Sequence, residues 1–240
     1  MKRQDLSLRS SASELMDDPA AGERDIRTVL RQLEFINTAC GFYRPHLRAL
    51  NFFLDHCHHS PSEPLRVLDI GCGAGGALRR IATWALRRGQ TVELTGIDLS
   101  PWSRSAALAA TPAHAGIRFL TGNIFSYVPE QPFHVAVSSL LAHHLGDPEL
   151  LALLAWMRRQ TRYGWLAHDL RRSRFAYALV RLGTGLLPFH PMIRHDGPLS
   201  VTRARTLGEW RRLAAAAGLE PAKVLVRRIG LLRCEVLGFA

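Results

Sequence analysis

The sequence predicts an α/β fold, a Rossmann-like sheet of seven strands that are mostly parallel. From Leu65 onward, short apolar strands alternate with amphipathic helices, a rhythm that requires right-handed crossovers between parallel neighbours. A glycine-rich turn at 71–76 separates the first of these strands from the helix that follows it. Two strand-like segments at 222–228 and 231–239 end the chain, and the short turn between them predicts an antiparallel hairpin.

Two regions precede the sheet. Residues 1–22 are polar and rich in Ser, Asp and Ala, so we expect a flexible N-terminus there. Apolar residues then recur at three- and four-residue spacing across 23–60, which predicts two helices broken near Gly41 and Pro45. Because these helices lie outside the sheet pattern, we expect them to form a lid or cap over a site.

The remaining residues, 61–240, are expected to form the ligand-binding domain. An apolar insertion at 171–205 interrupts the alternation after the fifth strand and is expected to contribute to a substrate pocket. Thr206 followed by Glu209 is a capping box and predicts a helix over 206–217. The first five strands are expected at 65–70, 91–98, 117–123, 133–140 and 164–170, with helices at 75–88, 101–110 and 147–160 between them.

Composition fits one domain with a proper core, since the 240 residues are 47% apolar. The net charge of +11 invites a nucleic-acid partner, but it comes almost entirely from arginines scattered along the chain, so we do not expect one. No apolar run is long enough to span a membrane and the N-terminus is no secretory signal, which predicts a cytoplasmic protein. No metal site is expected either, because the cysteines form no CxxC pair and the histidines near 56–59 lack a spaced partner. The sequence indicates no oligomeric state.

The segment VLDIGCGAGG at 67–76 is the most informative one. Glycines permit a tight turn and let a ligand lie against bare backbone, above the carboxyl ends of the strands. Gly71, Gly73 and Gly76 also match the GxGxxG fingerprint of dinucleotide sites. Asp69 argues against a dinucleotide, because a carboxylate there repels a pyrophosphate and favours a cationic or zwitterionic ligand.

Two further strand ends carry polar side chains. Asp98 follows Gly76 by 22 residues, the distance at which an acidic side chain reaches the hydroxyls of a ribose. Asn123 ends the third strand and could accept a hydrogen bond from an adenine amino group, although a turn residue is the simpler interpretation. The sequence therefore predicts a nucleoside ligand.

Four segments at the ends of expected strands form a recognisable set: VLDIGCGAG at 67–75, GIDLS at 96–100, TGNIF at 121–125 and FHVAVSSLLAHHL at 133–145. Together they resemble the motifs of the class I methyltransferases that use S-adenosylmethionine (SAM), of the small-molecule type found in natural-product and quinone pathways. The resemblance covers residues 65–170. It departs from the family at Asn123 and His134, where the family usually has Asp.

The resemblance implies SAM as the cofactor and a site along the first four strand ends. It implies the methionine end at the backbone of Gly71, Gly73 and Gly75, the ribose at Asp98, the adenine at Leu99, Asn123 and Ile124, and the sulfonium near Ser138 and Ser139.

Methyl transfer needs a base only when the acceptor is protonated. His143 and His144 directly follow the fourth strand, and we favour His144 because it is farther from the strand and freer to turn inward. Asp169 ends the fifth strand and could position the acceptor or cap a helix. His195 with its neighbour Asp196 could present an oriented imidazole, although a turn at Asp-Gly-Pro is the preferred interpretation.

The function expected from these residues is methyl transfer from SAM to a small-molecule acceptor, most simply O-methylation of a phenolic, enolic or polyketide-like compound. The alternative is a tRNA or rRNA methyltransferase, which only the net charge favours, since the chain has SSLL where such enzymes carry an NPPY-like motif. An NAD-dependent oxidoreductase is disfavoured by Asp69. A SAM-binding module without activity stays open.

Overall fold

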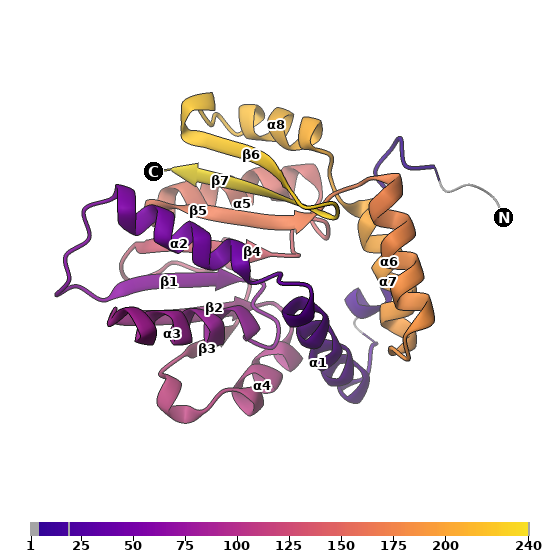
Figure 1. The fold of residues 1–240 in the computed structure, drawn as a ribbon, viewed down its shortest axis with the longest axis horizontal. Coiled ribbons are helices and arrows are strands. Elements are labelled where there is room, and N and C mark those ends of the chain that lie inside the picture. Colours follow the sequence, from indigo (N-terminus) through magenta and orange to yellow (C-terminus); the bar gives the residue numbers. More distant parts are fainter. Residues whose placement is uncertain (1–4, 19, 240) are drawn as a thin grey trace.

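The computed structural model describes residues 5–18 and 20–239; the parts of the expected flexible N-terminus at 1–4 and 19 lie outside the described residues, as does 240. Its centre is a seven-stranded sheet in the order β3-β2-β1-β4-β5-β7-β6. β7 runs antiparallel to both of its neighbours, and every other pair is parallel (Figure 1). The predicted fold class is confirmed. The strands are β1 (Leu65–Ile70), β2 (Val92–Asp98), β3 (Arg118–Thr121), β4 (Phe133–Ser139), β5 (Thr161–Leu170), β6 (Val224–Ile229) and β7 (Arg233–Phe239).

The sheet order creates a natural ligand site beside β1. The chain winds outward to β2 and β3 on one side and to β4 and β5 on the other, so the loops after β1 and β4 diverge. Ile70 at the end of β1 pairs with Ile97 of β2 and with Ser138 of β4. The residues that follow these three strands therefore meet at one edge of the sheet.

Helices cover both faces of the sheet. Leu50 and Phe53 of α2 and Leu78 of α3 are fully buried on one face, whereas α5 and α8 bury Leu150 and Trp210 on the other. The helices are α1 (Glu23–Ala39), α2 (Arg44–His56), α3 (Gly76–Arg88), α4 (Pro101–Ala110), α5 (Asp147–Gln160), α6 (Arg174–Leu186), α7 (Pro191–Arg203) and α8 (Leu207–Ala216), with short 3-10 turns η1 (Leu15–Asp17), η2 (Ala113–Ala115), η3 (Ile124–Ser126) and η4 (Pro221–Lys223). None of the described helices is long and apolar enough to cross a membrane.

The two helices expected to form a lid lie in different places. α2 packs on the face of the sheet as part of the core, because Leu50 and Phe53 share one buried cluster with residues of the sheet and of α3. α1 instead lies beyond the carboxyl ends of the strands, on the same side as α6 and α7 (Figure 1). Only α1 of this pair is therefore placed where it can cover a site.

The expected turn at 194–200 is wrong, because this segment is the middle of helix α7. Pro198 lies inside that helix, where its local preference is overridden by packing against α6. A Cβ atom on Gly197 would come within 3.0 Å of Thr184 in α6, so the two helices approach closely here. Tertiary contact outweighs the local turn signal.

Residues 5–18 are not a frayed segment, which corrects the expectation for this part of 1–22. Arg9 donates hydrogen bonds to the backbone oxygens of His143 and Leu145, both at 2.7 Å. The buried carboxylate of Asp196 in α7 accepts from the backbone N–H groups of Leu15 and Met16 at 2.9 and 3.0 Å. Polar contacts hold the segment, and a search for apolar periodicity does not detect them.

Candidate active site

A cavity of about 880 Å³ lies at the carboxyl ends of β1, β2 and β4. Its walls come from the glycine turn and strand ends on one side and from η1 and α1 on the other, where Met16 and Leu30 face inward. A second hollow of about 930 Å³ lies between α1 and α4. The first cavity is the candidate site, because most of the residues selected from the sequence lie around it.

The glycine turn has the backbone that the sequence predicts. Gly71, Gly73 and Gly75 have φ values of 72°, 50° and 76°, a left-handed conformation that favours glycine. Gly71 and Gly73 line the cavity. Gly75 does not line it; a Cβ atom there would approach Phe119 to 2.7 Å, so this glycine serves packing.

Asp98 joins β2 to the glycine turn. Its Oδ2 accepts a hydrogen bond from the backbone N–H of Gly73 at 2.9 Å, and its Oδ1 accepts one from Ser100 at 3.0 Å. Each carboxylate oxygen keeps further acceptor capacity toward the cavity that Asp98 lines. The side chain is therefore held rigidly where a pair of ribose hydroxyls could donate to it.

Asp69 is a buried acid at the opposite end of the turn. Its residue is 3% exposed, and it lines the cavity. Burial, together with the nearby charge of Asp98, raises the pKa of Asp69 to about 8. A cationic group in the cavity would reverse this shift, because an opposite charge favours the ionised carboxylate. The site therefore fits a ligand with an ammonium group near Asp69.

The segments that follow β2 and β3 offer apolar surfaces. Leu99 is 73% exposed and Phe125 is 41% exposed, and both line the cavity together with Ile124. Asn123 also lines it, but its Oδ1 accepts a hydrogen bond from the backbone N–H of Phe125 at 2.9 Å and caps η3. The turn role weighed for Asn123 is thus observed, and Phe125 is an addition that its place in the TGNIF segment could have indicated.

The two serines at the end of β4 differ. Ser139 lines the cavity, and its Oγ forms a hydrogen bond with His168 Nδ1 at 3.2 Å. Ser138 is 2% exposed and does not line the cavity, which corrects its expected place. Neighbouring residues of a strand point to opposite faces, so only one of the pair could face the ligand.

The four catalytic candidates separate into three groups. His144 lines the cavity. His143 and Asp169 lie buried behind it, with His143 Nδ1 at 2.7 Å from Asp169 Oδ1 and the His143 backbone N–H donating to Oδ2 at 2.8 Å. Asp169 is the penultimate residue of β5 and does not cap a helix. His195 pairs with Asp196 at 2.8 Å, the possibility weighed against a turn, but its side chain is half exposed and does not line the cavity.

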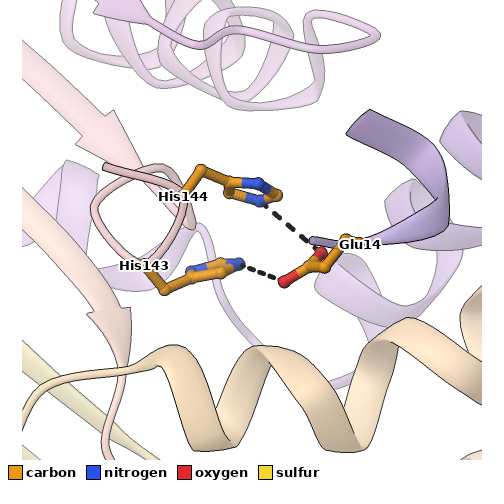
Figure 2. Close-up of side chains that lie close together, drawn as sticks. All are labelled: Glu14, His143 and His144. Atoms are coloured by element: carbon orange, nitrogen blue, oxygen red, sulfur yellow. Dashed lines mark ion pairs between the residues drawn. The ribbon is translucent and has the colours of Figure 1, made fainter. Parts of the chain in front are cut away.

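The sequence did not indicate two acids from the N-terminal segment. Glu14 is 3% exposed, and its carboxylate faces the imidazoles of both His143 and His144 from one side (Figure 2). Asp17 Oδ2 lies 3.0 Å from His144 Nδ1. Burial raises the pKa of Glu14 to about 7. These acids lie in a polar stretch without periodicity, and only the folded chain brings them to the histidines.

Comparison with known sequences confirms the resemblance in the central region. Residues 67–164, from β1 into β5, match the family of methyltransferase domains. Over 82 residues the chain is 35% identical to trans-aconitate 2-methyltransferase of Streptomyces avermitilis, covering 33% of this chain and 29% of that protein. Over 137 residues it is 28% identical to a non-reducing polyketide synthase of Penicillium shearii, covering 55% of this chain and 6% of the synthase. The chain therefore spans less than a third of the length of these two relatives.

Solved structures share the fold over most of the chain. Human N-acetylserotonin methyltransferase in complex with SAM aligns with a TM-score of 0.64 at 17% identity, over 91% of this chain and 56% of that one. The plantazolicin methyltransferase BpumL, in complex with a pentazolic desmethylPZN analog and S-adenosylhomocysteine (SAH), aligns with a TM-score of 0.62 at 15% identity, over 90% and 97%. LepI in complex with SAM aligns with a TM-score of 0.55 at 21% identity, over 76% and 44%.

Proposed function

Because residues 67–164 match the family of methyltransferase domains, we propose that this chain transfers a methyl group from SAM to a small-molecule acceptor. One observation carries the proposal: a buried acid, a bare glycine backbone and a second fixed acid follow one another along the strand ends. Asp69, Gly73 and Asp98 all line the same cavity. That order matches the ammonium, the backbone-contacting chain and the ribose of a nucleoside that carries an amino acid.

Each part of the site then has a binding task. Asp69 pairs with the ammonium group, the turn at Gly71 and Gly73 lies against the methionine chain, and Asp98 accepts from the ribose hydroxyls. Leu99 and Phe125, which line the cavity with exposed side chains, flank the adenine ring. When bound, SAM supplies an activated methyl group on a good leaving group. The protein then has to align the acceptor and keep water out.

The acceptor side of the cavity is formed by η1, α1 and the loop after β4. Leu33 and Leu141 offer apolar walls, while Asn37 and Tyr43 offer polar groups. Such a lining suits a compact, partly apolar molecule with one or two polar groups. We propose O-methylation of a phenolic, enolic or polyketide-like acceptor, which the similarity to a polyketide synthase and to methyltransferases of small molecules and peptides supports.

The proton of such an acceptor is removed at the edge of the cavity where His144 lies. His144 is the one of the four sequence candidates that lines the cavity, and Asp17 lies against its Nδ1. His143 and Asp169 support it from behind. An arrangement of this kind orients an imidazole toward the acceptor.

One neighbour favours a second candidate function. A structure described as a pericyclic reaction enzyme shares the fold with a TM-score of 0.55 at 21% identity. LepI was solved in complex with SAM. The second candidate is therefore an enzyme that binds SAM and rearranges its substrate without transferring the methyl group.

Calorimetry followed by a transfer assay tests the proposal. SAM and SAH should bind to the purified chain and NAD should not. A panel of phenolic, enolic and β-dicarbonyl acceptors with methyl-labelled SAM should yield a labelled product and SAH. NAD binding without SAM binding would overturn the cofactor assignment. Conversion of an acceptor without label uptake would favour the second candidate.

A further inference from the structure

Glu14, His143 and His144 bring three ligand atoms of the kinds that hold transition metals to one point. His143 Nε2 lies 3.8 Å from Glu14 Oε1, and His144 Nε2 lies 3.8 Å from Glu14 Oε2. Glu14 and His143 are buried, and His144 is four-fifths buried. Figure 2 shows both imidazoles pointing at the carboxylate from one side. One ligand atom from each of the three residues lies within 4.8 Å of the others.

The second nitrogen of each ring fixes the tautomer. His143 Nδ1 lies 2.7 Å from Asp169 Oδ1, and His144 Nδ1 lies 3.0 Å from Asp17 Oδ2. An ionised carboxylate only accepts hydrogen bonds, so both rings carry their proton on Nδ1. In the neutral form of each ring, the Nε2 lone pair is then bare. Carboxylates that hold the far nitrogen of a histidine are the usual surroundings of a metal-binding imidazole.

The bare lone pairs face another acceptor. Separations of 3.8 Å are too long for hydrogen bonds. Two neutral imidazole lone pairs aimed at a carboxylate repel it unless a positive group lies between them. A cation in that position converts the repulsion into three bonds.

We propose that Glu14, His143 and His144 bind one divalent transition-metal ion, with zinc as the ion that their chemistry suits best. Two imidazole nitrogens and one carboxylate oxygen are a known ligand set for zinc sites that keep an open position. With metal–ligand bonds of about 2.1 Å, a tetrahedral angle places two ligands about 3.4 Å apart. Each ring lies 3.8 Å from a different oxygen of Glu14, and the three ligand atoms lie within 4.8 Å of one another, so the side chains need to draw together by up to about 1.4 Å.

Arg203 lies near this point without competing for it. Its Nε is 3.8 Å from Glu14 Oε1, beyond hydrogen-bond distance. Its donors are engaged elsewhere, with the backbone oxygens of His143, His144 and Ala12 at 2.9 to 3.2 Å. Ser200 Oγ donates to Glu14 Oε1 at 2.9 Å and orients the carboxylate.

The local charge also suits a dication. Glu14, Asp17 and Asp169 contribute three carboxylates. Two guanidinium groups, those of Arg203 and Arg9, lie close, and Arg9 binds the backbone oxygen of His143. With neutral imidazoles the surroundings keep an excess of one negative charge, which a bound dication offsets.

A second cluster of histidine and carboxylate side chains is unsuitable for binding a metal ion. His59, Glu63 and His134 also lie close together. His134 Nδ1, however, accepts a hydrogen bond from the backbone N–H of Arg66 at 2.9 Å, so the neutral ring carries its proton on Nε2, which lies 3.1 Å from Glu63 Oε1. No lone pair of His134 is left for a metal. Glu63 therefore provides a matched control for Glu14.

The site opens to the cavity, because His144 and Asp17 line it. An acceptor oxygen could then occupy the open position and lose its proton by coordination, with His144 acting as a ligand in place of a free base. This consequence rests on the proposed function, whereas the metal site does not.

Zinc and cobalt titrations of the full chain, first stripped with a chelator, test the inference. The wild-type protein should take up one equivalent of zinc, and bound Co²⁺ should show the visible absorption of a low-coordinate site. Glu14→Gln and His144→Ala should weaken zinc binding at least tenfold while retaining the wild-type circular dichroism spectrum. Asp169→Asn should weaken it by about 10–100-fold through the loss of a supporting contact. Glu63→Gln should bind zinc like the wild type.

The site would be overturned by no stoichiometric zinc or cobalt binding, by unchanged binding in Glu14→Gln, or by loss of binding in Glu63→Gln alone. Uptake of Mg²⁺ without zinc would also overturn it, because imidazole is a poor ligand for magnesium. Asp98→Ala separates this inference from the proposed function. It should bind zinc normally and bind SAM more weakly, so a failure of one proposal leaves the other measurable.

Discussion

Asp98 and Gly73 are joined by a hydrogen bond of 2.9 Å between a side-chain carboxylate and a backbone N–H, and both residues line the cavity. The bond fixes the end of β2 against the turn after β1. The group proposed to bind the ribose thus also holds the shape of the turn proposed to bind the methionine chain. Loss of Asp98 is therefore expected to affect both ends of the ligand.

Asp98→Ala should weaken SAM binding by at least about 1–3 kcal/mol, the value of two lost hydrogen bonds to a charged acceptor. The unpaired N–H of Gly73 adds to that loss. Titration calorimetry with SAM and SAH measures it. Asp55→Ala removes an exposed acid from α2 and should leave the affinity unchanged. Equal affinities for wild type and Asp98→Ala would remove Asp98 from the site.

SAM affinity should depend on pH through Asp69, whose pKa is about 8 in the free protein. An ammonium ligand favours the carboxylate, so below pH 8 binding must first remove a proton from Asp69. The affinity should therefore fall about tenfold for each pH unit from 7.5 down to 5.5. Asp69→Asn should bind more weakly and show little pH dependence over that window. A flat wild-type profile would contradict the pairing.

The central strands and helices could be predicted from the sequence, because the residue patterns that determine them are local. The strand at 65–70 and the helices at 101–110 and 147–160 have the predicted bounds, since apolar alternation and proline or acidic starts determine them. α7 was missed, because Asp196-Gly197-Pro198 favours a turn locally and only packing against α6 overrides it.

Only those residues of the candidate site that lie within a recognisable sequence motif could be predicted. Asp69, Gly71, Gly73 and Asp98 lie within strand ends, and topology alone brings these together. Glu14 meets His143 across 129 positions of the chain, a relationship that no spacing rule shows. Which face a side chain takes was also beyond the sequence, as Ser138 and Ser139 illustrate.

The stability of the free protein should fall in mild acid because of His46. Its side chain is fully buried, and burial lowers its pKa from 6.5 to about 4. Between these values the unfolded chain binds a proton that the folded chain refuses, so stability is lost as the pH falls from 6.5 toward 4. This difference corresponds to about 3 kcal/mol at the acid end. Burial also lowers the pKa of His168, whose ring centroid lies 6.0 Å from that of His46.

Denaturant unfolding at several pH values measures this effect. His46→Phe should flatten the decline between pH 6.5 and 4, whatever its effect on absolute stability. His114→Phe, at an exposed position in η2, should keep the wild-type slope. Identical slopes in wild type and His46→Phe would show that His46 is protonated in the folded chain.

The N-terminal segment should be released by Arg9→Ala. Arg9 satisfies the backbone oxygens of His143 and Leu145 at 2.7 Å and that of Arg203 at 2.6 Å. Leaving such acceptors unpaired costs about 1–3 kcal/mol. Limited proteolysis should therefore cut within residues 5–18 of the variant faster than in the wild type, and turnover should fall because Glu14 and Asp17 leave the site. If residues 5–18 of Arg9→Ala resist proteolysis as they do in the wild type, contacts other than those of Arg9 are enough to hold the segment in place.

His144 is expected to matter for turnover and not for cofactor affinity. It lines the cavity, and its Nδ1 is held by Asp17. A phenolic acceptor with a pKa of about 10 must lose its proton at neutral pH. His144→Ala should therefore lower turnover by about 10²–10⁴ with SAM affinity unchanged. The remaining activity should rise with pH as the acceptor ionises in solution. His195→Ala should keep near-normal turnover, because that side chain does not line the cavity. If His144→Ala, His143→Ala and the double variant all turn over normally at neutral pH, alignment of acceptor and methyl group alone accounts for the rate.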